Sequence, residues 1–110
     1  MKYNIFYDKQ DWGTNIHFVA EDGLSFGAIE LLNEEPKTAY IYGIQVHDTI
    51  QRRGRGSNLI KIIEKYIKYY TNRKKIVLNC NYDIIEFYIK LGYLYLKDDN
   101  DMCVLYKIIK

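Results

Sequence analysis

The residues best suited to chemistry form a basic, glycine-rich turn at positions 51–57. The turn reads Gln51, Arg52, Arg53, Gly54, Arg55, Gly56 and Ser57. Glycine adopts backbone angles denied to other residues and lets the main chain approach a ligand closely. The helix predicted after it would present free N–H groups and a partial positive charge at its first turn. This arrangement is typical of a pyrophosphate site, although a plain strand-to-helix turn with solvated arginines would have the same composition.

Spacing excludes two common phosphate motifs, and charge indicates where an anion would bind. GxxxxGK[ST] is absent, and Gly54 and Gly56 lack the third glycine of GxGxxG. Residues 1–50 hold three lysines against eight acids, whereas residues 51–75 hold nine basic residues against Glu64 alone. An anion should therefore approach the middle segment.

The alternative is a non-catalytic module whose basic segment binds nucleic acid or a protein, although the lysines there fall on the solvent face of the predicted helix.

The elements that position this turn are predicted from hydrophobic periodicity. Strands are expected at 2–7, 16–21, 24–32 and 39–46, with an Asp22-Gly23 hairpin turn and a loop at 33–37. Apolar residues at spacings of three and four predict a helix over 57–70. A strand at 75–78, a helix from a capping box of Asp83 and Glu86 to Gly92, and strands at 93–96 and 102–109 around a turn at 97–101 complete the chain. This order predicts a single α/β domain over residues 1–110, with a mixed sheet and two main helices.

Two segments resemble the GNAT superfamily of N-acetyltransferases. Residues 46–56, VHDTIQRRGRG, are similar to its coenzyme A signature, a strand-end Val followed by Gln/Arg-x-x-Gly-x-Gly/Ala. Residues 81–93, NYDIIEFYIKLGY, are similar to its downstream segment Asn-x-x-Ala-x-x-Phe-Tyr-x-Lys-x-Gly-Phe. The resemblance covers residues 39–110 and implies a GNAT-like fold with a reduced N-terminal region. It also implies acetyl-CoA as the cosubstrate and no metal.

The resemblance further implies how the coenzyme is bound. In the family, the strand before the turn splays from its neighbour and its backbone binds the pantetheine arm, a role that falls on Ile44, Gln45 and Val46. The backbone N–H groups that bind the pyrophosphate correspond to residues 51–57. Tyr88 matches a tyrosine that protonates the departing thiolate, and Asn81 matches a polar residue that hydrogen-bonds the pantetheine region. The structural alternatives are a core aromatic for Tyr88 and a helix-entry turn residue for Asn81.

The implied reaction is direct transfer of the acetyl group to an amine. A neutral amine attacks the thioester carbonyl, the N–H of Val46 polarises the oxygen, and the thiolate leaves. No covalent enzyme intermediate is needed, so Cys80 is not expected to be a nucleophile. The base that deprotonates the amine stays open between His47, whose ordinary pKa suits the task, Glu30, and a water chain.

Two departures from the family pattern concern the groove and the acceptor. Ile84 replaces a small alanine, which would tighten the coenzyme groove or shift its helix outward. The hairpin-like start leaves no room for two helices that wall the acceptor site in relatives. An open site suits a protein lysine or N-terminus, with a small amine such as a polyamine as the alternative. A second subunit, in a homodimer, is another way to supply the missing wall, and the acidic N-terminal half favours a cationic acceptor.

Composition adds expectations about location and cysteine chemistry. The chain has no apolar stretch of bilayer-spanning length and starts without a signal-peptide run, so we expect a cytoplasmic protein that does not bind membranes. Cys80 and Cys103 have neither CxxC spacing nor nearby histidines, so buried free thiols are expected rather than a disulfide or zinc site.

Overall fold

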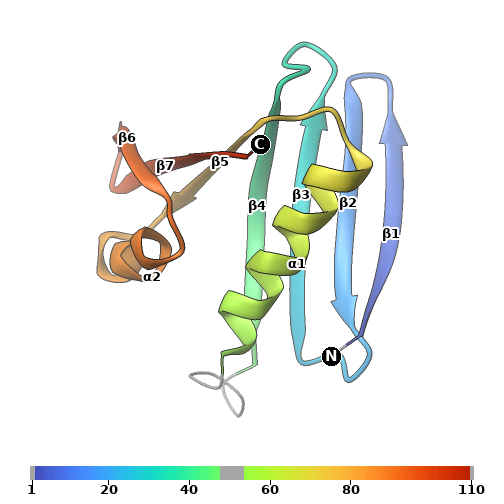
Figure 1. The fold of residues 1–110 in the computed structure, drawn as a ribbon, viewed down its shortest axis with the longest axis horizontal. Coiled ribbons are helices and arrows are strands. Elements are labelled where there is room, and N and C mark those ends of the chain that lie inside the picture. The colour runs from blue at the N-terminus through green and yellow to red at the C-terminus, as the bar shows by residue number, and fades with distance from the viewer. Residues whose placement is uncertain (1, 48–53, 110) are drawn as a thin grey trace.

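Seven strands and two α-helices make up the computed structural model, which describes residues 2–47 and 54–109 (Figure 1). The elements are β1 (Tyr3–Gln10), β2 (Gly13–Ala20), β3 (Ser25–Leu32), β4 (Thr38–Val46), α1 (Arg55–Tyr70), β5 (Lys75–Cys80), the 3₁₀ turn η2 (Tyr82–Ile84), α2 (Ile85–Lys90), β6 (Leu94–Asp99) and β7 (Met102–Ile108). All strands join one mixed sheet. The predicted α/β architecture is confirmed.

The strand order in the sheet is β1-β2-β3-β4-β5-β7-β6. Neighbouring strands are antiparallel except β4 and β5, which are parallel and joined through α1. Parallel neighbours need a crossover connection, and the amphipathic α1 is that connection. The predicted Asp22-Gly23 hairpin is confirmed: Gly23 has φ 72, and the Leu24 N–H donates to the Asp22 carboxylate at 3.0 Å.

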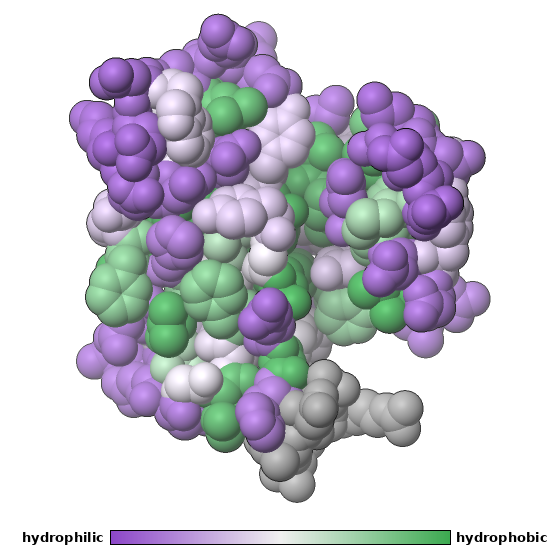
Figure 2. Space-filling view, turned by 180° about the vertical axis from the view of Figure 1, so that it is seen from behind, coloured by the Kyte–Doolittle hydropathy of each residue, from purple (hydrophilic) through white to green (hydrophobic). Residues whose placement is uncertain are grey.

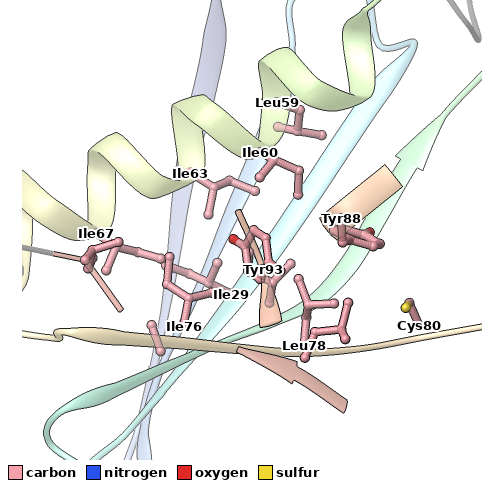
Figure 3. Packing of buried hydrophobic residues seen from close by; sticks show 14 of the residues in the cluster. Ile29, Leu59, Ile60, Ile63, Ile67, Ile76, Leu78, Cys80, Tyr88 and Tyr93 are labelled. Atoms are coloured by element: carbon pink, nitrogen blue, oxygen red, sulfur yellow. The ribbon is translucent and has the colours of Figure 1, made fainter. Parts of the chain in front are cut away.

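The core lies between α1 and one face of the sheet (Figure 3). Four α1 residues are fully buried, at helical spacing: Leu59, Ile60, Ile63 and Ile67. Gly27 on β3 lets the helix approach, because a Cβ there would lie 2.8 Å from Ile63 Cδ1. At 3.6 residues per turn these side chains form one stripe, which explains why the periodicity predicted this helix well. The helix starts at Arg55, two residues earlier than predicted.

The C-terminal third corrects two predictions. The capping box is wrong: a 3₁₀ turn precedes α2, the α2 N-cap position is Ile84, and neither helix start carries a side-chain cap. Asp83 lies inside the 3₁₀ turn and is therefore too early to cap α2. The turn between the last strands is also shorter than expected, because β6 continues through Asp99 and Asn100 turns the chain with φ 55.

The sheet face away from α1 is not covered by any helix among the described residues. Figure 2 shows this face, where apolar and weakly polar side chains form a band bordered by hydrophilic ones. The turn from Asp11 to Trp12 joins β1 directly to β2. The predicted absence of helices at this connection is confirmed. Among the described residues, no helix combines the length and apolarity needed to cross a membrane.

Candidate functional site

The candidate site begins where β4 and β5 separate. Their parallel pairing ends at Ile41 and Leu78, although both strands continue beyond these residues. On its other side, β4 shifts register against β3, so Tyr42 is an extra residue between the paired Ile41 and Gly43. Such a bulge bends a strand and increases its twist. The splay that the family resemblance implies is therefore present, and it is visible in Figure 1 as the angle between β4 and β5.

Two hollows meet along this opening. The smaller, of about 150 Å³, lies between β4 and β5. The larger, of about 430 Å³, continues to the first turn of α1 and is lined by Ile44, Val46, Gly54, Gly56, Ser57, Ile84, Phe87 and Tyr88. Both hollows share Ile44, Ile84 and Tyr88, so they form one continuous depression, which we call the groove. Its apolar walls and polar helix end suit a linear ligand with an apolar arm and an anionic group.

The start of α1 supplies the polar end of the groove. Gly54 is the N-cap in the left-handed conformation, with φ 76, and no atom lies within 4 Å of the Cβ that another residue would have. Backbone conformation, and not space, therefore requires glycine there. The first intrahelical bond runs from the Asn58 N–H to the Gly54 carbonyl at 3.0 Å. Because the N–H groups of the first turn lack intrahelical partners and this turn carries no acid, it favours an anion.

The predicted phosphate-binding residues fall into two groups. Gln51, Arg52 and Arg53 lie outside the described residues. Gly54, Gly56 and Ser57 line the groove. The Ser57 hydroxyl donates to the Gly54 carbonyl at 3.1 Å, so this side chain is engaged with the helix start.

Arg55 directs its side chain away from the groove. Its guanidinium donates to both Asp22 carboxylate oxygens, at 3.0 and 3.1 Å, and to the Ser25 hydroxyl at 2.8 Å. Ser25 in turn hydrogen-bonds the Tyr3 hydroxyl at 2.7 Å. Hydrogen bonding to Arg55 lowers the pKa of Asp22. Arg55 therefore ties the start of α1 to the β2–β3 turn and to β1, and its backbone is the part available to a ligand.

Tyr88 lies where the two hollows meet. It is 7% exposed, and its ring packs edge-on against Phe87 and Tyr93. Burial raises the pKa of its phenol, and the nearby Cys80 thiol adds to the effect. A phenol with a raised pKa stays protonated at neutral pH, so Tyr88 is a protonated phenol that both lines the groove and packs in the core.

Asn81 and Ile84 both line the groove. Asn81 follows β5, lines the smaller hollow and makes no side-chain cap to η2. Ile84 lines both hollows and is 46% exposed, so the larger side chain forms part of the groove wall.

His47 and Gln45 line a different hollow. Both border a depression of about 450 Å³ beside the β2–β3 turn, which His47 joins through its N–H bond to the Leu24 carbonyl at 2.7 Å. His47 is four residues beyond Gly43, or about 13 Å along an extended strand. The structure thus brings Tyr88 and Asn81 together at the smaller hollow, whereas His47 lines a neighbouring depression that shares Ile44 and Val46 with the groove.

Sequence reasoning missed that the two cysteines face each other. Cys80 on β5 pairs with Cys103 on β7, and their sulfur atoms are 3.3 Å apart. Both are buried and free, which confirms the predicted thiol state. Burial, with the Cys103 hydrogen bond, raises the pKa of the Cys80 thiol to about 12. Cys80 therefore stays a thiol at neutral pH and is a poor nucleophile, although it lines the smaller hollow.

The basic segment 51–75 is only partly a cationic surface. Arg73 donates to three backbone carbonyls around the β3–β4 connection, including Leu32 at 2.8 Å and Thr38 at 3.2 Å. Arg55 is bound to Asp22. Two of the arginines are thus structural, which weakens the case for a nucleic-acid surface.

Comparison with known proteins agrees with this geometry. Residues 5–102 match the family described as the acetyltransferase (GNAT) domain. No curated protein sequence matches the chain significantly. Similar solved structures include an acetyltransferase from Thermus thermophilus, with TM-score 0.76 and 14% identity over 86% of this chain and 64% of that one.

Two further structures have similar folds. A proposed acyl-CoA N-acyltransferase from Klebsiella pneumoniae has TM-score 0.74 and 13% identity, with 98% of both chains covered. The PaiA N-acetyltransferase from Thermoplasma acidophilum, solved in complex with coenzyme A, has TM-score 0.72 and 15% identity over 86% of this chain and 59% of that one. The chain therefore spans less than two thirds of the Thermus and Thermoplasma proteins.

The family match covers most of the chain, and the fold, splayed strands and glycine turn agree with it. The chain therefore belongs to the GNAT acetyltransferase family.

Proposed function

We propose that the protein transfers the acetyl group of acetyl-CoA to a primary amine, with a protein lysine or N-terminus as the acceptor. The observation that carries this proposal is the groove, which joins the N-terminus of α1 to the opening between β4 and β5 with Tyr88 at the junction. The pyrophosphate would bind the N–H groups of the glycine turn, and the pantetheine arm would lie along the splayed part of β4. The thioester would then reach the smaller hollow.

The reaction uses few groups. The amine nitrogen attacks the thioester carbonyl carbon, the carbon–sulfur bond breaks, and the coenzyme leaves as a thiolate that takes a proton from Tyr88. A backbone N–H on β4 between Gly43 and Val46 stabilises the oxyanion. The attacking nitrogen loses its proton to water, because neither His47 nor Glu30 lines the groove.

Calorimetric titration with acetyl-CoA tests the donor site. A Cβ at position 56 would lie 3.3 Å from Phe87 Cζ, so Gly56→Val narrows the groove. We expect binding by the wild type and a loss of at least about tenfold in the variant, whose thermal unfolding is measured in parallel. Asn58→Ala is the control, because Asn58 is an exposed residue of α1 that does not line the groove, and this variant should bind acetyl-CoA normally. Wild-type protein that does not bind acetyl-CoA would favour the non-catalytic module.

Release of coenzyme A thiol then separates the acceptor classes. Lysine-containing peptides, free N-terminal peptides and polyamines are supplied as acceptors, and the product is identified by mass spectrometry. Turnover of peptides supports the protein acceptor, whereas turnover of polyamines alone contradicts it.

A further inference from the structure

The sheet face opposite the helices carries a row of oxygen-bearing side chains. Strand register places Asp8 beside Asn15, Asn15 beside Glu30, and Glu30 beside Tyr40, on four adjacent strands. Cross-strand partners point to the same face, so these side chains form one line across β1–β4. We call these four residues the acidic row. The neighbouring line on the other face, with Ile16 and Ile29, packs in the core under α1.

The acidic row has no positive partner within residues 2–47 and 54–109. Asp8 accepts a hydrogen bond from neutral Gln10 at 2.9 Å, and neither Asp8 nor Glu30 takes part in an ion pair there. The Asn15 Oδ1 atom between them is buried without a hydrogen-bond partner. Lys9, the lysine of β1, pairs with Thr14 and so points to the opposite face. Two carboxylates without a cationic partner among the described residues favour a cation at this place.

The acidic row leads to the groove. Tyr42 is half-exposed and lines the smaller hollow, and both Glu30 and Asp8 act on it electrostatically. A side chain that passes Tyr42 therefore enters the opening between β4 and β5 from the side opposite α1. The basic residues of α1 lie on the helix side of the sheet, so the two faces differ in charge. An anionic donor and a cationic acceptor would approach from opposite sides.

We infer that the uncovered face of β1–β4 docks a basic segment of an acceptor protein, whose reactive amine enters the groove past Tyr42 while the acidic row binds its neighbouring lysine or arginine side chains. This inference rests on the proposed function and adds the class of acceptor. From β4 to β1 the row spans three strand spacings, or about 14 Å, the length of about four extended residues. The acceptor should therefore carry further basic residues within about four positions of the reactive amine.

The same features disfavour two other occupants. A second copy related by a two-fold axis would place one acidic row against another, which is repulsive. A small polyamine needs enclosure, but the row lies on an open strand face, and neither Asp8 nor Glu30 lines a hollow described above.

Direct binding tests the inference separately from catalysis. A fluorescent peptide with one lysine and two nearby arginines is titrated with the full chain by anisotropy, beside a peptide with glutamines for the arginines. Asp8→Asn/Glu30→Gln should raise the Kd for the basic peptide about tenfold and abolish the preference between peptides. Glu34→Gln/Asp101→Asn changes net charge equally at exposed positions elsewhere and should keep wild-type affinity.

Each outcome is decisive because acetyl-CoA binding is measured in parallel on every variant. Loss of acetyl-CoA binding in the wild type would refute the proposed function, while peptide binding would still report on the surface. Equal Kd values in both double variants would overturn the inference. The inference would also be overturned if spermidine abolished peptide binding and the protein showed no preference for the basic peptide. A third contrary result is a wild-type dimer in sedimentation that Asp8→Asn/Glu30→Gln dissociates.

Discussion

Alanine at Gly54 should weaken coenzyme binding, whereas alanine at Gly23 should not. The two positions are matched: φ is 76 at Gly54 and 72 at Gly23, and no atom lies within 4 Å of an added Cβ at either. The cost of each substitution is therefore the left-handed backbone alone, about 1 kcal/mol. For a domain of this size we expect each variant to lose about 4 °C in Tm.

Only Gly54 lies in the groove, at the N-cap of α1. An alanine there either keeps the strained φ or relaxes and rotates the first N–H groups of the helix. We expect Kd for acetyl-CoA to rise at least about tenfold, or 1.4 kcal/mol, for Gly54→Ala and to stay at the wild-type value for Gly23→Ala. Calorimetry and thermal unfolding measure both quantities. Equal Kd values for the two variants at equal Tm would refute the role of the helix start.

Three further predictions concern Tyr88, Asp22 and Cys80. Tyr88→Phe should lower kcat about 100-fold with little change in KM for acetyl-CoA. If Tyr88 had only a structural role, the substitution would change Tm and leave kcat unchanged. Asp22→Asn should release Arg55 and weaken acetyl-CoA binding. Because Arg55 lowers the pKa of Asp22, the wild type should also be more stable than this variant above about pH 4, and the difference in stability should vanish as the pH falls further. Denaturant unfolding at several pH values checks this sign, and an advantage that persists at pH 2 would contradict it. Cys80, with its thiol pKa raised to about 12, should resist iodoacetamide at pH 8 in the native protein and react after unfolding, and stability should fall as pH rises from about 9 towards 12; rapid native alkylation, read by mass spectrometry, would refute it.

Local signals predicted the elements that dominate the fold. The helical stripe of α1, the Asp22-Gly23 turn and the apolar β4 each depend on residues close together in the sequence, and each was predicted within a few residues. Predictions failed where one residue type suits more than one local structure. Asp83 has the residue type of a helix cap, but it lies inside the 3₁₀ turn, and α2 begins after it. The polar residues of β6 indicated a turn, whereas pairing with β7 keeps them extended.

Contacts between distant residues could not be predicted from one sequence. The Arg55–Asp22–Ser25 network, the Cys80–Cys103 pair and the acidic row all depend on strand order and register. A register shift of one residue would move the side chains of the shifted strand, such as Glu30 on β3 or Cys103 on β7, to the other face of the sheet. Tyr88 and Asn81, the site residues that the resemblance predicts, lie in one strand-to-helix segment, and both line the smaller hollow.

The groove that we propose for the donor does not depend on the reduced N-terminal region for its walls. The groove is built from β4, α1, β5 and α2, and its walls are supported by core residues such as Leu59 and Ile60 from the same elements. The hairpin of β1 and β2 contributes through Tyr3, which reaches Ser25 and hence Arg55 at the start of α1. Without helices between β1 and β2, the face next to the groove is exposed, and under the inference above its charge would select the acceptor. Changing Asp8 and Glu30 should therefore alter which amine is used while acetyl-CoA binding, on the other side of the sheet, is unchanged.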